Sequence, residues 1–154
     1  MAKKEETTQR PVATNRKARH EYAVLETIEA GLVLKGTEVN SLRQGNANLA
    51  EGYARVAGGE VWLEGVHVSP YKQGSDANVD PLRRRKLLLH RREIRKLQAR
   101  VAEAGVTLIP LKLYFRQNVA KIELGVCRGK RAYDKRQSIA KREADRALRR
   151  MIRR

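Results

Sequence analysis

Two neighbouring stretches of the chain, residues 107–116 and 119–128, alternate between apolar and polar positions. Because successive side chains of a β-strand point to opposite faces, this period of two predicts two strands that each bury one face. Gln117-Asn118 lies between them and predicts a tight turn, so the pair is expected to form a hairpin. The apolar positions are Ile109, Leu111, Leu113 and Phe115, and then Ala120, Ile122, Leu124 and Val126.

Shorter strands are predicted in the N-terminal half. Four runs there contain β-forming residues: 20–29, 32–34, 49–56 and 60–68. Glu29-Ala30-Gly31 is typical of a turn and separates the first two runs. Gly58-Gly59 separates the last two runs, which are therefore expected to form a second hairpin.

Helical spacing marks two further segments. Val39 and Leu42 are three residues apart between a candidate N-cap, Thr37, and Gly45, which predicts a short helix. A longer helix is predicted from His90 to the residue before Gly105. Its apolar positions are Ile94, Leu97, Val101 and Ala104.

These elements predict a mainly β fold. About six short strands with tight turns and two to three helices favour a small antiparallel barrel of the OB type, an architecture that commonly binds oligonucleotides. We expect a disordered N-terminal arm over residues 1–14, the barrel over residues 15–129, and a basic C-terminal tail over residues 130–154.

Charge changes this picture most. The chain has 154 residues and a net charge of +17, but the charge is concentrated in two segments. Residues 82–100 carry net +8 and residues 128–154 net +9, whereas residues 23–81 carry net −4. Two basic segments on an acidic body favour defined contacts with a polyanion, most often nucleic acid, over a basic surface that only keeps the protein soluble.

Other classes of protein find little support. The chain lacks an apolar run of the ~18 residues that a membrane span needs, and its N-terminal residues lack the apolar core of a secretory signal. The single cysteine, Cys127, is expected to be a core residue in a reducing, cytoplasmic compartment. Neither a metal-ligand spacing nor a nucleotide-binding or hydrolase motif occurs, so no cofactor, metal or catalytic residue is expected.

Several basic segments are candidate RNA contacts. Arg83-Arg84-Arg85-Lys86 is the densest cluster, and four successive cations repel one another unless phosphates neutralise them. Asn15-Arg16-Lys17-Ala18-Arg19-His20 combines cations with amide and imidazole groups that contact bases or phosphates. Tyr133 lies within a basic stretch, where an aromatic ring can stack on a base. For each segment, a solvated polar surface is the alternative.

The tail has its own pattern. Apolar residues at helical spacing are mostly alanine, so they bury too little surface to dock firmly on the barrel. We expect the tail to be disordered when free and helical on a polyanion. The positions are Ala140, Ala144, Ala147, Leu148 and Met151.

Five motifs in order resemble one known family, the bacterial SsrA-binding proteins (small protein B), from about residue 14 to the C-terminus. They are residues 15–22 (NRKARHEY), 29–34 (EAGLVL), 36–39 (GTEV), 80–89 (DPLRRRKLLL) and 129–136 (GKRAYDKR). The hairpin turn at Gln117-Asn118 departs from the family, in which a glycine is common there.

The resemblance implies an OB-like barrel and a role in trans-translation as a binding adaptor without enzymatic activity. The family binds the tRNA-like domain of transfer-messenger RNA and brings it, with elongation factor Tu and GTP, to stalled ribosomes. The nascent peptide is then tagged for degradation and the ribosome is released. We expect a monomer with no membrane partner.

The resemblance also assigns residues. Asn15, Glu29 and Leu88 resemble positions needed for RNA binding, and Arg16, Lys17, His20, Arg85 and Lys86 are added on chemical grounds. Contact with the decoding centre of the small ribosomal subunit is implied for Lys130, Arg131, Tyr133, Asp134, Lys135 and Arg136. The tail beyond Gln137 resembles the helix that lies in the empty mRNA channel.

Two alternatives remain open. A ribosomal protein or general RNA chaperone would share a small barrel with basic tails, and an RNA-processing enzyme would need a catalytic constellation. The charge distribution does not separate the adaptor from the chaperone; only the ordered motifs do.

Overall fold

The computed structural model describes residues 11–130 and 132–152, except for the side chains of residues 75–76 and 132–138. Within this part, seven antiparallel strands form the main sheet in the order β1-β8-β4-β5-β7-β2-β9. Because β8 also pairs with β9, six of the strands close into a ring, and β1 adds to its edge at β8. The strands are β1 (Ala13–Thr14), β2 (Tyr22–Leu32), β4 (Tyr53–Ala57), β5 (Glu60–Glu64), β7 (Arg85–Leu88), β8 (Val106–Arg116) and β9 (Val119–Gly129).

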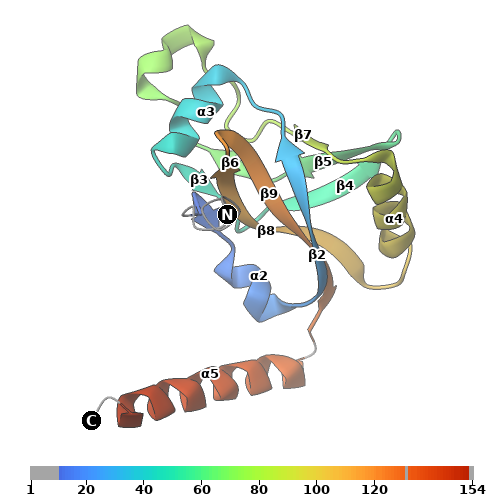
Figure 1. The fold of residues 1–154 in the computed structure, drawn as a ribbon, viewed down its shortest axis with the longest axis vertical. Helices are drawn as coiled ribbons and strands as arrows, with labels where there is room; N and C mark the ends of the chain where they lie inside the picture. The colour runs from blue at the N-terminus through green and yellow to red at the C-terminus, as the bar shows by residue number, and fades with distance from the viewer. Residues whose placement is uncertain (1–10, 131, 153–154) are drawn as a thin grey trace, which may run out of the picture.

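Helices lie around this ring (Figure 1). In the described residues they are α2 (Arg16–Glu21), α3 (Gly36–Arg43), α4 (Arg91–Val101), α5 (Ala132–Ile152) and the 3-10 helix η1 (Lys72–Ala77). A short ladder of β3 (Ala47–Asn48) and β6 (His67–Val68) lies near α3. None of the helices in the described ranges is long and apolar enough to cross a membrane.

Two apolar cores hold the fold together. The larger fills the inside of the ring with side chains such as Leu63, Leu87 and Leu124, all at most 1% exposed. The smaller lies where α2 covers the outer face of β8 and β9, and contains Ala18, Ile109, Leu111 and Cys127. Burial raises the pKa of the Cys127 thiol to about 11. The prediction that Cys127 is a core residue is confirmed.

A β-bulge divides β8 between the two cores. The pairing with β9 shifts between Pro110 and Lys112. Ile109 therefore packs under α2, whereas Leu113 and Phe115 pack in the larger core. The single apolar face expected for residues 107–116 is thus wrong, because the bulge reverses which side of the strand is buried.

The β8–β9 hairpin itself is confirmed, with a two-residue turn at Gln117 and Asn118. Both residues have positive φ, 51° and 65°, as a type I′ turn requires. The hairpin of β4 and β5 is also confirmed, with its turn at Gly58-Gly59. The helices expected near residues 37–45 and 90–104 correspond to α3 and α4.

Other expected boundaries are corrected. Glu29-Ala30-Gly31 lies inside β2, so the two short strands expected at residues 20–34 are one long strand. The residue that precedes α3 is Lys35 rather than Thr37. Ala13 and Thr14 pair with β8, so the chain joins the sheet before residue 15, the expected start of the ordered domain.

The helix α5 follows β9 after a short connection and lies apart from the sheet, beyond α2 (Figure 1). Its described side chains, from Ile139 to Ile152, are exposed. Few contacts therefore tie this helix to the ring, as expected for a stripe dominated by alanine.

Candidate RNA-binding site

Glu29 and Leu88 are 59 positions apart in the sequence, yet they line one hollow on the surface of the ring. The hollow measures about 350 Å³, and we call it the Glu29–Leu88 hollow. Its lining residues are Glu29, Gly31, Leu88, Leu89, His90, Glu93 and Lys121. The structure thus brings together two residues that the family resemblance implies for RNA binding.

Leu88 is the apolar wall of the hollow and is 55% exposed. It lies directly across from Gly31 in the antiparallel pair of β2 and β7. A Cβ at position 31 would approach the Leu88 Cβ to 3.3 Å, closer than most such contacts. Glycine at position 31 therefore lets the leucine side chain lie over β2, where it remains exposed to a partner.

Glu29 is the acceptor in the hollow and is held by two neighbours on β8. The Tyr114 hydroxyl donates a hydrogen bond to Glu29 Oε2, and the Arg116 Nη1 lies 3.0 Å from the same oxygen. Burial and the carboxylate together raise the pKa of Tyr114 well above its usual value. Tyr114 and Arg116 thus hold the Glu29 carboxylate in place, and its oxygens can accept a hydrogen bond from a 2′-hydroxyl or a base N–H.

Lys86 and Arg85 are separated by the alternation of β7. The Lys86 side chain faces outward, 38% exposed, and its Nζ lies 2.9 Å from Glu60 Oε1. The Arg85 side chain faces inward and is 1% exposed. Of these two predicted RNA contacts, only Lys86 is therefore at the surface.

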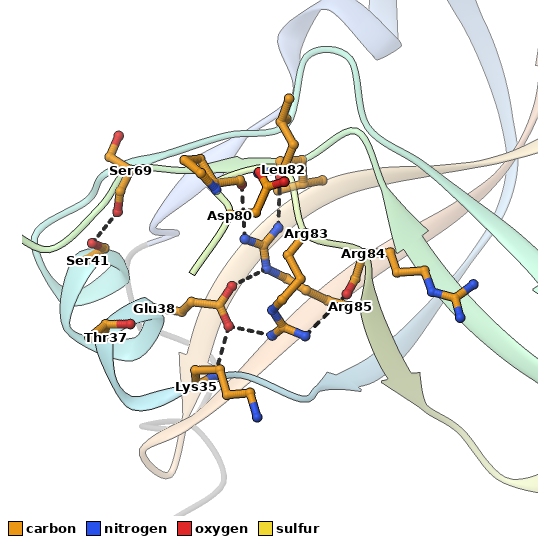
Figure 2. Close-up of polar contacts among 12 residues, drawn as sticks. Lys35, Thr37, Glu38, Ser41, Ser69, Asp80, Leu82, Arg83, Arg84 and Arg85 are labelled. Atoms are coloured by element: carbon orange, nitrogen blue, oxygen red, sulfur yellow. Dashed lines mark hydrogen bonds and ion pairs between the residues drawn. The ribbon is translucent and has the colours of Figure 1, made fainter. Parts of the chain in front are cut away.

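Arg85 belongs to a buried cluster with Glu38, shown in Figure 2. Its Nε lies 2.7 Å from Glu38 Oε2, and its Nη1 donates to the Val66 carbonyl at 2.8 Å. Arg83 Nη2 lies 2.5 Å from Glu38 Oε1, which also accepts from the Lys35 amide at 2.8 Å. The interpretation of Arg85 as an RNA contact is corrected, because its guanidinium is buried and hydrogen-bonded within the protein.

Opposing effects set the charge of Glu38. Burial disfavours the carboxylate, but the hydrogen bonds from Arg83, the Lys35 amide and Arg85 favour it, and the net result is a lowered pKa. Glu38 therefore remains ionised at neutral pH and neutralises part of the charge of the 83–86 run. This role of Glu38 is not predicted from the sequence. The only indications are an acidic residue on a predicted helix and, far along the chain, a basic run that needs neutralising charge.

Asn15 is also buried, at 2% exposure, and it holds α2 in place. Its Oδ1 accepts from the Ala18 amide at 3.0 Å, which caps the helix. Its Nδ2 donates to the carbonyls of Leu49 and Pro110 at 3.1 and 3.0 Å. Asn15 is thus placed to orient α2, and its assignment to RNA binding stays a prediction that would act through this helix.

The cations of α2 are at the surface. Arg16 and Lys17 are exposed and His20 is partly exposed. Lys17 Nζ lies 2.9 Å from Glu51 Oε1, and this contact raises the pKa of Lys17. These three predicted RNA contacts lie on α2, away from the Glu29–Leu88 hollow on β2 and β7.

The residues predicted to reach the decoding centre lie at the start of α5. Lys130 Nζ donates to the Arg19 carbonyl at 3.0 Å, at the C-terminal end of α2. Arg131 lies outside the described residues. Tyr133, Asp134, Lys135 and Arg136 have helical backbone, and their side chains lie outside the described part.

Comparisons with known proteins agree with one another. The family model of the SmpB protein matches residues 12–154. The SsrA-binding protein of Desulforudis audaxviator is 56% identical over 153 residues, covering 99% of this chain and 98% of that protein. That of Acetivibrio thermocellus is 55% identical over 152 residues, covering 99% and 97%.

One solved structure is similar as well. It is described as "tmRNA-SmpB: a journey to the center of the bacterial ribosome". Its protein chain matches with a TM-score of 0.68 at 53% identity, covering 80% of this chain and 87% of that one. On sequence and fold together, the chain belongs to the SmpB family of SsrA-binding proteins.

Proposed function

We propose that the chain is the RNA-binding adaptor of trans-translation. It is a non-enzymatic SsrA-binding protein that acts with transfer-messenger RNA on ribosomes. More specifically, it binds the tRNA-like domain of that RNA and brings it to ribosomes stalled without a stop codon. The nascent peptide is then tagged and the ribosome is released.

The Glu29–Leu88 hollow carries this proposal. It offers an exposed apolar side chain, a fixed carboxylate acceptor and the cation Lys121 within one concave surface. RNA that is folded like a tRNA presents unstacked bases and 2′-hydroxyls, which such a surface recognises by stacking, apolar contact and hydrogen bonds. A basic surface without an acceptor would bind any phosphate backbone instead.

The ring of six strands supports an OB-like barrel as the scaffold of this site. Such barrels bind nucleic acids on their outer faces and loops. The outward positions of β7 and the exposed cations of α2 fit this use. We assign residues 15–129, which contain the ring of six strands, to binding the RNA.

The tail is assigned to the ribosome. Residues 128–154 carry net +9, and the described side chains of α5 are exposed. A vacant mRNA channel is lined by phosphates and attracts such a helix, whereas a channel filled with mRNA excludes it. The start of the tail, Lys130 to Arg136, is placed at the decoding centre.

The remaining parts of the proposal follow from the adaptor role. Delivery takes place in the cytoplasm in a complex with elongation factor Tu and GTP, and the protein acts as a monomer. The single buried cysteine fits a reducing compartment.

A competition binding assay at about 150 mM salt tests the proposal, because salt sets the strength of non-specific binding. Labelled transfer-messenger RNA competes against bulk tRNA and duplex RNA. We expect wild type to prefer transfer-messenger RNA and Glu29→Ala to lose that preference, since the acceptor in the hollow is removed. A chain ending at Gly129, which lacks the whole tail, should keep the preference.

Glu26→Ala is the matched control. Glu26 lies on the same strand, its carboxylate is 32% exposed like that of Glu29, and it also pairs with cations, Lys96 and Arg100. It lies outside the hollow, so its loss should leave the preference unchanged. Equal binding of all three RNAs by wild type would instead favour a general RNA chaperone.

A further inference from the structure

Trp62 is the single tryptophan of the chain and lies on β5 beneath an arginine. The Arg84 Cζ is 4.1 Å from the centre of the Trp62 ring. Arg84 is exposed, and among the described residues no carboxylate lies within ion-pair distance of it. Figure 2 shows Arg84 pointing away from the buried cluster of Glu38, Arg83 and Arg85. A planar cation on an indole ring is therefore available at the surface.

Cations flank this stack on both sides. Arg55 on β4 and Lys86 on β7 are the cross-strand neighbours of Trp62. Each is paired with a glutamate on β5: Arg55 with Glu64 at 2.8 Å and Lys86 with Glu60 at 2.9 Å. Arg55 and Lys86 are therefore neutralised within the protein. Among the described residues, Arg84 is the cation next to Trp62 that has no carboxylate partner, so it can pair with an external anion.

The stack is continuous with the Glu29–Leu88 hollow. Residues 84, 86 and 88 alternate along the chain, so Arg84, Lys86 and Leu88 share the outward face around β7. A second hollow, of about 440 Å³, connects Glu60 and Lys86 to Leu88 and His90. The second hollow therefore continues from the Glu29–Leu88 hollow along β7 to Lys86, the cross-strand neighbour of Trp62.

We propose that Trp62 and Arg84 form a stacking site for an unpaired nucleotide of the bound RNA. The base stacks on the guanidinium, which the indole supports from beneath, and the guanidinium edge pairs with the adjacent phosphate. An aromatic ring beside an arginine without a carboxylate partner suits a nucleotide, which offers both a π-face and a negative charge. The inference rests on the proposed function for the identity of the RNA and adds a second contact to it.

Trp62 supplies the measurement, because its fluorescence reports this site alone. The full-length protein is titrated with transfer-messenger RNA and, separately, with a short oligoadenylate. We expect both RNAs to quench the fluorescence. Trp62→Leu should weaken binding of transfer-messenger RNA about tenfold, the effect of losing one stacked base, and Trp62→Phe should retain most of the affinity.

Arg84→Ala and Arg55→Ala are matched variants, since each removes one exposed cation from the same face. Arg84→Ala should weaken binding and reduce the slope of log affinity against log salt by about 0.7, the value for one phosphate on a single strand. Arg55→Ala should change both little, because Arg55 is paired with Glu64. Circular dichroism melts of each variant establish that the fold is retained.

The outcomes separate this site from the proposed function. Unchanged fluorescence with both RNAs, together with wild-type affinity of Trp62→Leu, overturns the stacking site even when the preference for transfer-messenger RNA and its dependence on Glu29 hold. The same face would then serve a protein partner or none. A different result would support the stacking site and contradict the adaptor function. In that case wild type shows no preference for transfer-messenger RNA, yet oligoadenylate quenches its fluorescence and Arg84→Ala abolishes the quenching.

Discussion

At the scale of single residues, position within a strand decides what a cation does. Arg85 and Lys86 are neighbours in the chain, yet the alternation of β7 buries the first and exposes the second. A buried guanidinium is tolerated only with a counter-ion and filled hydrogen bonds, which Glu38 and the carbonyls of Val66 and Pro81 provide. Arg85 thus fixes the strand that presents Lys86 and Leu88.

Glu38→Gln tests this role through stability. The substitution leaves the buried charge of Arg85 without a counter-ion, so we expect a loss of about 3–5 kcal/mol in the free energy of unfolding at neutral pH. Urea denaturation measures it. Glu60→Gln is the control: it breaks an exposed pair with Lys86 and should cost less than about 1 kcal/mol.

The free energy of unfolding of wild type and of Glu38→Gln should depend on pH differently. The pKa of Glu38 is lowered by folding from its ordinary value of 4.5, so its contribution is complete above about pH 4.5 and declines as the pH falls through the folded value. Wild type should lose this part of its stability on acidification, and Glu38→Gln should show a flatter dependence below pH 4.5. Parallel slopes for both proteins would contradict the assignment.

At the scale of elements, the sequence predicts those that local pattern specifies. The β8–β9 hairpin follows from a period of two and α4 from a period of 3.6, although the bulge in β8 divides its apolar positions between the two cores. Strand β7 is not predicted from the sequence, because it begins within the basic run at 83–86. Its inward position 85 holds a cation, and the partner of that cation, Glu38, is 47 residues away. Gly31 is typical of a turn in the sequence, but it lies within β2. Its lack of a side chain there makes room for Leu88 across the sheet.

The candidate site was predictable to the same extent. The family resemblance implied Glu29 and Leu88, but their meeting in one hollow depends on the pairing of β2 with β7, a long-range contact without a local pattern. Tyr114 and Arg116, which hold Glu29, come from β8 and were missed for the same reason. Asn15 was assigned to the RNA, and its burial is a consequence of docking α2 on Leu49 and Pro110.

Asn15→Ala tests how α2 is held. The substitution removes a helix cap and leaves the carbonyls of Leu49 and Pro110 without their donor, so we expect a loss of about 1–3 kcal/mol in the free energy of unfolding. Affinity for RNA should fall through the displaced cations of α2. Asn48→Ala, which removes one local hydrogen bond to the Ala50 amide at an exposed position, should change stability and affinity little. Denaturation and RNA titration measure both quantities, and equal effects of the two variants would contradict the role of Asn15.

At the scale of the whole molecule, the two basic segments are mounted differently. The first follows the wall of the ring, where β7 and α4 hold it at fixed positions. The second continues from β9 into α5. Its contacts with α2 include Lys130, just before the helix, with the Arg19 carbonyl and Arg142 with His20. A rigid basic surface suits recognition of a folded RNA, and a helix held by few contacts suits entry into a channel.

Ala147→Pro separates the charge of the tail from its helical structure. Proline in a helix interior removes a backbone hydrogen bond and costs about 3 kcal/mol, but it changes no charge. If α5 lies in the vacant mRNA channel as a helix, Ala147→Pro should bind transfer-messenger RNA like wild type and yet tag few peptides on ribosomes stalled without a stop codon. Ala147→Ser, which keeps the helix at a small cost in propensity, should tag normally. Normal tagging by Ala147→Pro would mean that the positive charge acts without the helix, as expected for a chain attracted by phosphates alone.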